Sequence, residues 1–369
     1  MVNHLIGLTI ALLPLFTKIA EFDVSRLSKD NLLLIIMMAF CFILPDKKRK
    51  LPVIGYVGLT YGLFSIVYNQ WNPISIMVQL QSFYLAAGMV FFCCFYERFD
   101  FKNISAILNG MALGCLIQSI LVILSSGGVQ LYPRLFEFFY SDLKITNMDA
   151  PGIGSLGNTN TLAAYVSITS IALMRDGFKK LLFLPVIALL IANSLMGYVT
   201  ILGGALYLIN LKLNILKKYQ VYLLTSLSMV GAVVFGVGGM DTKRFAMWKK
   251  IVSNMDFPHF LFGKGPGWFY DQSFVNGSEI AIQEHNELIS AINIFGIIGV
   301  MLLVLTFARF FTRSDKSKVF PAILFASFIN SFGHFTLHQS TTAIIVIVSA
   351  AICLAEGEKI CHRRGTAAP

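Results

Sequence analysis

Charged side chains are scarce in this sequence. Only 13% of its 369 residues are Asp, Glu, Lys or Arg, whereas a soluble domain usually carries about 25%. Hydrophobic residues make up 56% of the chain. They recur in runs of roughly 15–23 residues, and about 20 apolar residues are needed to cross a bilayer. The scarcity of charge therefore excludes an ordinary soluble domain and predicts an all-α integral membrane protein that contacts the lipid bilayer through many helices.

Several chemical signatures are missing as well. No H-E-x-x-H or similar ligand spacing occurs, although His334 and His338 are i, i+4, so we expect no metal. The turn G-K-G-P-G at 263–267 has the wrong residue order for a nucleotide-binding phosphate loop, and we expect no cofactor. The N-terminus lacks a basic segment and an A-x-A-like cleavage site, which predicts a retained first helix.

The apolar runs define twelve expected membrane spans, with both termini on one side. They cover 4–18, 31–45, 51–69, 75–95, 104–126, 160–174, 181–194, 196–211, 221–239, 288–310, 319–334 and 339–355. The connections after every second span and the C-terminal tail, together with Arg309, hold 19 of the 29 Lys and Arg residues. Short cytoplasmic loops collect these residues, so this side is predicted to be cytoplasmic. The net charge of +10 is then a topology signal, and we expect no nucleic-acid partner.

One span boundary depends on this charge pattern. Residues 181–210 contain no charged side chain and could form one long apolar helix. A single helix would invert the topology after it and place the basic loops on alternating sides. We therefore predict a tight outer turn at Asn193 and Ser194. None of the six cysteines falls in an outer loop of the resulting topology, so no disulfide framework is predicted.

The expected outer loop at about 127–160 ends in a run rich in glycine and asparagine. Residues 151–165 read P-G-I-G-S-L-G-N-T-N-T-L-A-A-Y, and Asn158 or Thr159 is expected to cap the following helix. One interpretation is simply a capped loop that enters a span. In the other, exposed amides and Asn side chains at the helix N-terminus face an anionic or sugar ligand.

The outer segment 240–287 is the predicted functional loop of a single membrane domain that covers 1–369. Phe245, Trp248 and Val252 recur at helical spacing, which predicts an amphipathic helix on the outer membrane surface. Basic residues gather in this loop, against the topology rule: Lys243, Arg244, Lys249, Lys250 and Lys264. The helix alone is compatible with an interfacial anchor, whereas the gathered cations suit a phosphorylated lipid.

The end of this loop reads G-S-E-I-A-I-Q-E-H-N-E-L over 277–288 and predicts the start of a helix that continues into the next span. Glu284, His285 and Glu287 would stand just above the membrane. A histidine at a helix start is often structural. The neighbouring carboxylates favour a second interpretation, in which a neutral imidazole accepts a proton from a sugar hydroxyl.

Together these pieces resemble the O-antigen ligase and polymerase superfamily of bacterial membrane glycan transferases. The shared order is R-x-x-x-W at 244–248, a G-x-G turn at 263–265, H-N at 285–286, and an apolar helix with Gly296 and Gly299. The run G-N-T-N-T-L-A-A-Y at 157–165 is similar to the family's G-N-x-N-x-x-A. The motifs span 155–300, and the twelve-span plan extends the resemblance to the whole chain.

The resemblance implies a metal-independent glycosyltransferase that acts on the periplasmic face of the bacterial inner membrane. Its donor would be a glycan on undecaprenyl pyrophosphate. Its acceptor would be lipid A–core in a ligase, another lipid-linked glycan in a polymerase, or a pilin in related enzymes. Arg244 would neutralise the leaving pyrophosphate, and His285 would be the catalytic base. The side chains expected to bind substrate are Lys243, Trp248, Lys249, Lys264, Asn286, Glu287, Asn158 and Arg134.

The sequence departs from the family at one place. Many members carry S-R-G near the end of a middle span, whereas 193–197 reads N-S-L-M-G, with Met196 at the arginine position. Arg134, Lys249 or Lys264 would then have to replace that arginine. Two rival classes stay open: a transporter or flippase for a lipid-linked sugar, which should carry ionisable residues near mid-membrane, and a structural partner in an assembly complex.

Overall fold

The structure is a computed structural model of the 369-residue chain. It describes residues 2–15, 18–21, 26–28, 39, 50–51, 53–68, 76–98, 104–129, 159–175, 177–213, 253, 255–265, 271–275, 278–282, 286–311, 318–332 and 340–365. All structural statements below concern these ranges.

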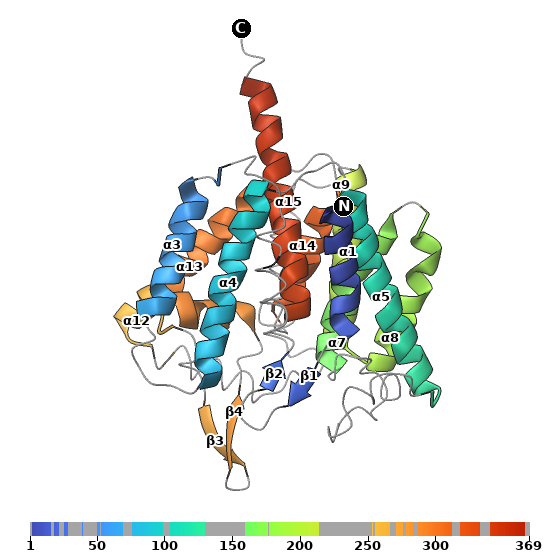
Figure 1. The fold of residues 1–369 in the computed structure, drawn as a ribbon, viewed down its shortest axis with the longest axis horizontal. Helices are drawn as coiled ribbons and strands as arrows, with labels where there is room; N and C mark the ends of the chain where they lie inside the picture. The colour runs from blue at the N-terminus through green and yellow to red at the C-terminus, as the bar shows by residue number, and fades with distance from the viewer. Residues whose placement is uncertain are drawn as a thin grey trace.

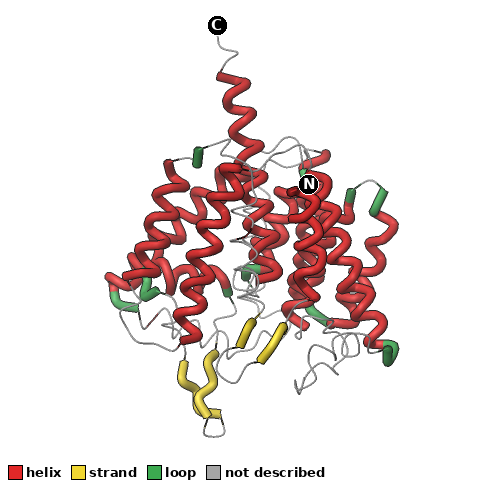
Figure 2. Tube along the Cα trace, in the orientation of Figure 1, coloured by secondary structure: helices red, strands yellow, loops and turns green. Residues whose placement is uncertain are grey.

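The described part of the chain is a bundle of α-helices, as Figures 1 and 2 show. The helices are α1 (Val2–Leu12), α3 (Val53–Tyr68), α4 (Ile76–Arg98), α5 (Ile104–Ser126), α7 (Thr159–Ser170), α8 (Phe183–Ala192), α9 (Leu195–Leu213), α12 (Phe257–Phe262), α13 (Glu287–Phe311), α14 (Val319–Asn330) and α15 (Ser340–Gly365). Short 3₁₀ helices extend three of them: η1 (Leu13–Leu15), η5 (Ile171–Met174) and η6 (Lys179–Leu182). The helical class predicted from composition is confirmed.

Two short antiparallel hairpins, which the sequence analysis did not predict, accompany the helices. The first pairs β1 (Lys18–Glu21) with β2 (Arg26–Ser28). The second pairs β3 (Asp271–Val275) with β4 (Ser278–Ile282). Both hairpins lie at one end of the bundle, which we call the hairpin end (Figure 1). Both chain termini lie at the opposite end, the termini end (Figure 1).

The expected spans can be compared with the helices directly. Spans 31–45 and 221–239 fall outside the described residues, Ala39 excepted, and each of the other ten coincides with a described helix. By length and composition, α5 and α9 are able to cross a membrane, and five further apolar helical segments are shorter. The described helices therefore match the expected apolar runs, while the count of twelve crossings stays a prediction.

The predicted turn between α8 and α9 is present. Asn193 adopts a left-handed backbone conformation, with φ 47° and ψ 46°, and its N–H donates to the Leu190 carbonyl. Asn is one of the few residues that tolerate this conformation. The Ser194 hydroxyl then accepts a hydrogen bond from the Gly197 N–H at 3.3 Å, which caps α9. The uncharged run therefore forms two helices, as the charge pattern predicted.

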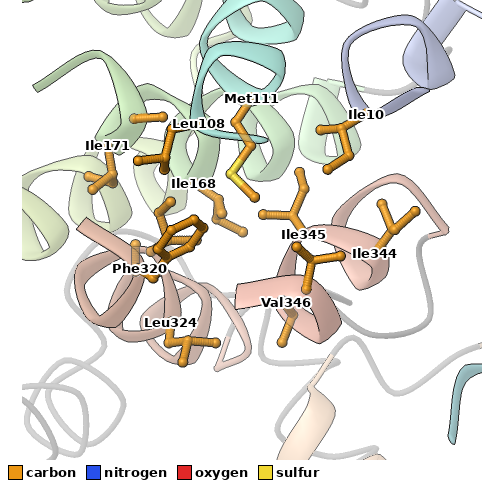
Figure 3. Packing of buried hydrophobic residues seen from close by; sticks show 14 of the residues in the cluster. Ile10, Leu108, Met111, Ile168, Ile171, Phe320, Leu324, Ile344, Ile345 and Val346 are labelled. Atoms are coloured by element: carbon orange, nitrogen blue, oxygen red, sulfur yellow. The ribbon is translucent and has the colours of Figure 1, made fainter. Parts of the chain in front are cut away.

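The core lies where α1, α5, α7, α14 and α15 meet. In Figure 3, Met111 of α5, Ile168 of α7 and Ile345 of α15 point toward one another, and all three are fully buried. The buried hydroxyls of Ser167, Thr169 and Ser170 donate to carbonyls of α7 itself, and the buried Tyr165 hydroxyl donates to the Ile10 carbonyl of α1 at 3.2 Å. Because these polar groups find hydrogen-bond partners inside the bundle, α7 can be buried on all sides. The hairpin end lies at one end of this packed core.

Candidate functional site at the hairpin end

The structure describes three of the residues predicted to act on substrate. Lys264, Asn286 and Glu287 lie in described ranges. The other predicted site residues lie outside the described residues: Arg244, His285, Lys243, Trp248, Lys249, Asn158 and Arg134. The roles proposed for these seven residues stay predictions. The site is therefore built from the segments that flank them, α12 and the beginning of α13.

The loop at 240–287 differs in one respect from the expectation. The helix predicted to begin within 277–288 begins at Glu287, and Ser278–Ile282 is instead strand β4, paired with β3. The segment S-E-I-A-I contains two β-branched residues, Ile280 and Ile282, and such residues are enriched in strands. The paired residues Val275 and Ser278 are separated by Asn-Gly, which is the strongest short-range signal for a hairpin.

Asn286 fixes the beginning of α13. Its Oδ1 accepts a hydrogen bond from the Ile289 N–H at 3.1 Å, which satisfies one of the free amides of the first turn. Its Nδ2 donates to the Phe332 carbonyl at 3.0 Å. The Glu287 N–H donates to the Ser331 carbonyl at 2.9 Å. Asn286 therefore acts as an N-cap and also ties α13 to the end of α14.

The first turns of α13 carry a buried polar face. Glu287, Ser290 and Asn293 follow at three-residue spacing and are only 7%, 1% and 2% exposed. Residues three apart lie on one side of a helix. A carboxylate in the first turn also interacts favourably with the positive end of the helix dipole. Polar side chains thus continue inward from the position next to His285 in the sequence.

Helix α13 is interrupted at Gly296. This residue has φ 66° and ψ −179°, a conformation open essentially only to glycine. In a continuous helix each carbonyl accepts from the amide four residues later. The break removes the Asn293, Ile294 and Phe295 carbonyls from that pattern, so they need donors from elsewhere. We call residues Asn293–Gly296 the α13 break.

The donors come from the G-x-G turn at Gly263–Gly265, which we call the glycine hook, and from α3. In the hook, the Lys264 N–H donates to the Asn293 carbonyl at 2.6 Å and the Gly265 N–H to the Ile294 carbonyl at 3.2 Å. From α3, the Ser65 hydroxyl donates to the Ile294 carbonyl at 3.1 Å and the Tyr61 hydroxyl to the Phe295 carbonyl at 2.7 Å. Every carbonyl exposed by the break is therefore satisfied.

The predicted cation Lys264 has a carboxylate in its electrostatic environment. Asp256 caps α12 by accepting from the His259 N–H at 2.9 Å, and the His259 Nδ1 lies 2.5 Å from the same carboxylate oxygen. The hydrogen bond from the His259 N–H, followed by the charges of His259 and Lys264, lowers the pKa of the Asp256 carboxyl. The backbone of Lys264 is fixed in the hook, while its ammonium group is partly balanced by Asp256.

Two further observations bear on the predicted chemistry. Among the described residues, no three His, Cys, Asp or Glu side chains gather closely enough to hold a metal ion. Met196, at the position where the family pattern suggests an arginine, packs against the hydrophobic core in the first turn of α9. A positive charge for a pyrophosphate would therefore have to come from another residue.

No protein-family model matches the sequence, and no curated protein is significantly similar to it. The resemblance to the glycan transferases therefore rests on the motif residues themselves.

Proposed function

We propose that this chain is an inner-membrane glycosyltransferase of the O-antigen ligase type. In this proposal it transfers a glycan from undecaprenyl pyrophosphate to an acceptor on the periplasmic face. The acceptor is lipid A–core or, in a polymerase of the same superfamily, a growing lipid-linked glycan. The hairpin end faces the periplasm and the termini end faces the cytoplasm, with twelve membrane spans between them.

One observation carries the proposal: motif pieces that are far apart in the sequence form one structural unit. The glycine hook at 263–265 is hydrogen-bonded to the α13 break, roughly thirty residues later in the sequence. Asn286, from the H-N pair, caps the half-helix that leads into the break. The spacing of the motifs thus has a physical basis, because the hook supplies the donors that the break requires.

The positions of the termini and of two basic residues support this orientation. Both termini lie at the same end of the bundle (Figure 1), as an even number of spans requires. α4 and α9 end with Arg98 and Lys212 in their last turns, and both helices end at the termini end (Figure 1). Basic residues gather on the cytoplasmic side of membrane proteins. The hairpin end, with the functional loop, is then periplasmic.

The proposed reaction needs a base and a stabiliser of negative charge. An acceptor hydroxyl attacks the anomeric carbon of the donor sugar while the bond from that carbon to the pyrophosphate oxygen breaks. His285 takes the proton of the hydroxyl, and Arg244 stabilises the charge on the departing pyrophosphate. Asn286 holds the backbone next to His285 at the beginning of α13, and this would limit the positions open to the base.

The break in α13 favours a second candidate, a transporter for a lipid-linked sugar. Transporters use discontinuous helices whose unwound carbonyls coordinate substrate or ions. Here the Asn293, Ile294 and Phe295 carbonyls already accept hydrogen bonds from protein donors, so they are poorly placed to bind an ion. Uptake of donor into sealed vesicles that lack an acceptor would favour the transporter, and its absence would favour the transferase.

The decisive experiment replaces the two predicted catalytic residues and follows glycan transfer. Arg244→Ala and His285→Ala should abolish transfer in purified protein and leave the yield of membrane-inserted protein unchanged. Lys180→Ala and His4→Ala are matched controls, because both side chains are exposed and lie far from the functional loop in the sequence. Full activity of either loop variant would refute the assignment, as would equal losses in the controls.

The glycan ladder of a strain without the protein separates the two enzymes. Loss of all long surface glycan, with accumulation of lipid-linked polymer, would identify a ligase. Transfer of a single repeat only would identify a polymerase. An unchanged ladder would favour the transporter or an assembly partner without its own chemistry.

A further inference from the structure

Helix α12 exposes large aromatic side chains. Phe257, Phe260 and Phe262 are 73%, 37% and 55% exposed, and they make up half of this six-residue helix. A flexible loop could turn such side chains away from water. α12 cannot do so easily, because the glycine hook that follows it is hydrogen-bonded to the α13 break. The exposed phenylalanine side chains are therefore a fixed feature of the surface.

The contacts of Tyr61 give the position of α12 along the bundle. The Tyr61 hydroxyl lies 3.4 Å from the Phe262 carbonyl and 2.7 Å from the Phe295 carbonyl. Tyr61 precedes the end of α3 at Tyr68 by seven residues, which corresponds to about 10 Å of helix. In Figure 1, α12 lies beside the lower part of α3 and does not reach the lower ends of α4 and α5. The segment therefore folds back toward the middle of the bundle.

Helix α3, which contacts α12, also exposes an apolar surface. Phe64 and Val67, in the half of α3 toward the hairpin end, are 62% and 63% exposed. They belong to a stripe with helical spacing that includes Val53, Tyr56 and Val57, all of them exposed. Such a stripe on a long apolar helix is typical of a surface that contacts lipid. α12 and α3 meet where the Tyr61 hydroxyl lies 3.4 Å from the Phe262 carbonyl, so both exposed apolar surfaces belong to neighbouring elements.

The backbone of the segment is compatible with a lipid environment. Irregular backbone inside a bilayer is tolerated only where its polar groups find protein partners. The hook amides of Lys264 and Gly265 donate to the α13 break, and the Gly263 N–H donates to the His259 carbonyl at 2.7 Å. The titratable side chains of the segment are Asp256, which precedes α12, His259, whose Nδ1 lies 2.5 Å from the Asp256 carboxylate, and Lys264 in the hook. Asp256 can remain at the headgroup level, and the long side chain of Lys264 can carry its ammonium group toward the same level.

We propose that α12 and the glycine hook form a re-entrant element that dips into the outer leaflet, with Phe257, Phe260 and Phe262 against lipid acyl chains. The inference rests on the membrane placement that is part of the proposed function. It gives the functional loop a fixed anchor point next to α3.

Photocrosslinking tests this inference on the full chain in its native membrane. The photoreactive phenylalanine analogue p-benzoylphenylalanine is introduced singly in place of Phe257 or Phe260, and phospholipid adducts are measured by mass spectrometry of the purified protein. Leu202, exposed on α9, serves as the lipid-facing reference. Lys180, in an exposed basic turn, serves as the water-facing reference, and the buried Phe320 of α14 reports crosslinks within the protein.

We expect lipid adducts at positions 257 and 260 with a yield like that at position 202. We expect no lipid adducts at positions 180 and 320. Adducts at 202 without adducts at 257 and 260 would overturn it and leave the proposed function standing. Absence of adducts at 202 as well would overturn the membrane placement, and with it both proposals. Lipid adducts at 257 and 260 in a chain that transfers no glycan would overturn the proposed function alone.

Discussion

Gly263 and Gly296 lie against each other although 32 residues separate them in the sequence. A Cβ atom on Gly263 would come within 2.7 Å of the Gly296 nitrogen and would overlap the Ile294 carbonyl. A Cβ atom on Gly296 would overlap the Leu261 carbonyl. Both residues also have positive φ, 82° and 66°. The contact thus depends on glycine at both positions for two reasons, backbone conformation and space.

We expect Gly263→Ala and Gly296→Ala to destabilise the protein strongly. The unfavourable backbone conformation alone costs about 1–3 kcal/mol for a residue with a side chain. The overlap with backbone carbonyls adds to this, because backbone atoms cannot move aside as the end of a side chain can. Thermal unfolding of the detergent-solubilised protein should show a lower Tm for both variants.

Two other glycine residues provide controls. Gly128 has φ 82° but nothing within 4 Å of its Cβ position, so Gly128→Ala adds only the strain. Gly58 lies in α3 with nothing within 4 Å, and Gly58→Ala should be neutral or stabilising by up to about 1 kcal/mol. If Gly263→Ala lowered the Tm no more than Gly128→Ala, the close contact at the hook would be wrong.

The sequence predicts the helices better than it predicts the contact between the glycine hook and the α13 break. The helix boundaries follow from apolar runs separated by charge, and the turn at Asn193 was found because charge alternation required it. The break at Gly296 was not predicted, because F-G-I-I-G continues an apolar run and an isolated glycine is tolerated inside a helix. The break depends on donors from the hook and α3, which are distant in the sequence and leave no local signal.

The sequence also predicts the candidate site only in part. Asn286 was predicted to bind substrate, whereas both polar groups of its side chain bond to the protein. A capping residue and a ligand-binding residue at the beginning of a helix have the same side-chain chemistry, so the sequence could not separate them. The hairpin of β3 and β4 was predictable from Asn-Gly, but the residues of its second strand, Ser278–Ile282, were expected to lie at the start of a helix.

Tyr61 and Ser65 both donate to the α13 break, but we expect them to contribute unequally. Tyr61→Phe removes the hydroxyl that donates to the part-buried Phe295 carbonyl and leaves that carbonyl without this donor, which costs about 1 kcal/mol. Ser65→Ala leaves the Ile294 carbonyl with the Gly265 N–H and should cost less. Tm values of the two variants provide the comparison. A larger loss in Ser65→Ala than in Tyr61→Phe would contradict the hydrogen-bond assignment.

Asn286→Ala should lower stability by about 0.5–2 kcal/mol through loss of the N-cap, with a further loss from the unpaired Phe332 carbonyl. Asn286→Asp keeps an oxygen that can accept from the Ile289 N–H and removes only the donor to Phe332, so its Tm should fall between those of Asn286→Ala and the wild type. Glycan transfer is measured on the same preparations. If Asn286→Ala lost transfer at an unchanged Tm, the residue would bind substrate and not support the helix.

The attachment of α12 should weaken in acid. The hydrogen bond from the His259 N–H lowers the pKa of Asp256 below its usual value of 3.8. A carboxyl group whose pKa is depressed in the folded state contributes stability above its unfolded pKa and loses that contribution as pH falls through the folded value. Protection of the α12 amides should therefore be constant from neutral pH down to about 5 and should decrease below about 4.

Hydrogen–deuterium exchange across Phe257–Phe262, corrected for the intrinsic rate at each pH, measures this decrease. Asp256→Asn retains an acceptor oxygen but cannot titrate, so protection in this variant should not change between pH 5 and 3. Asp256→Ala lacks the acceptor and should be less protected at every pH. A decrease in wild-type protection between pH 7 and 5 would point to a different titrating group, since Asp256 is fully ionised throughout that range. An equal acid response in Asp256→Asn would likewise show that the cap does not control the attachment of α12.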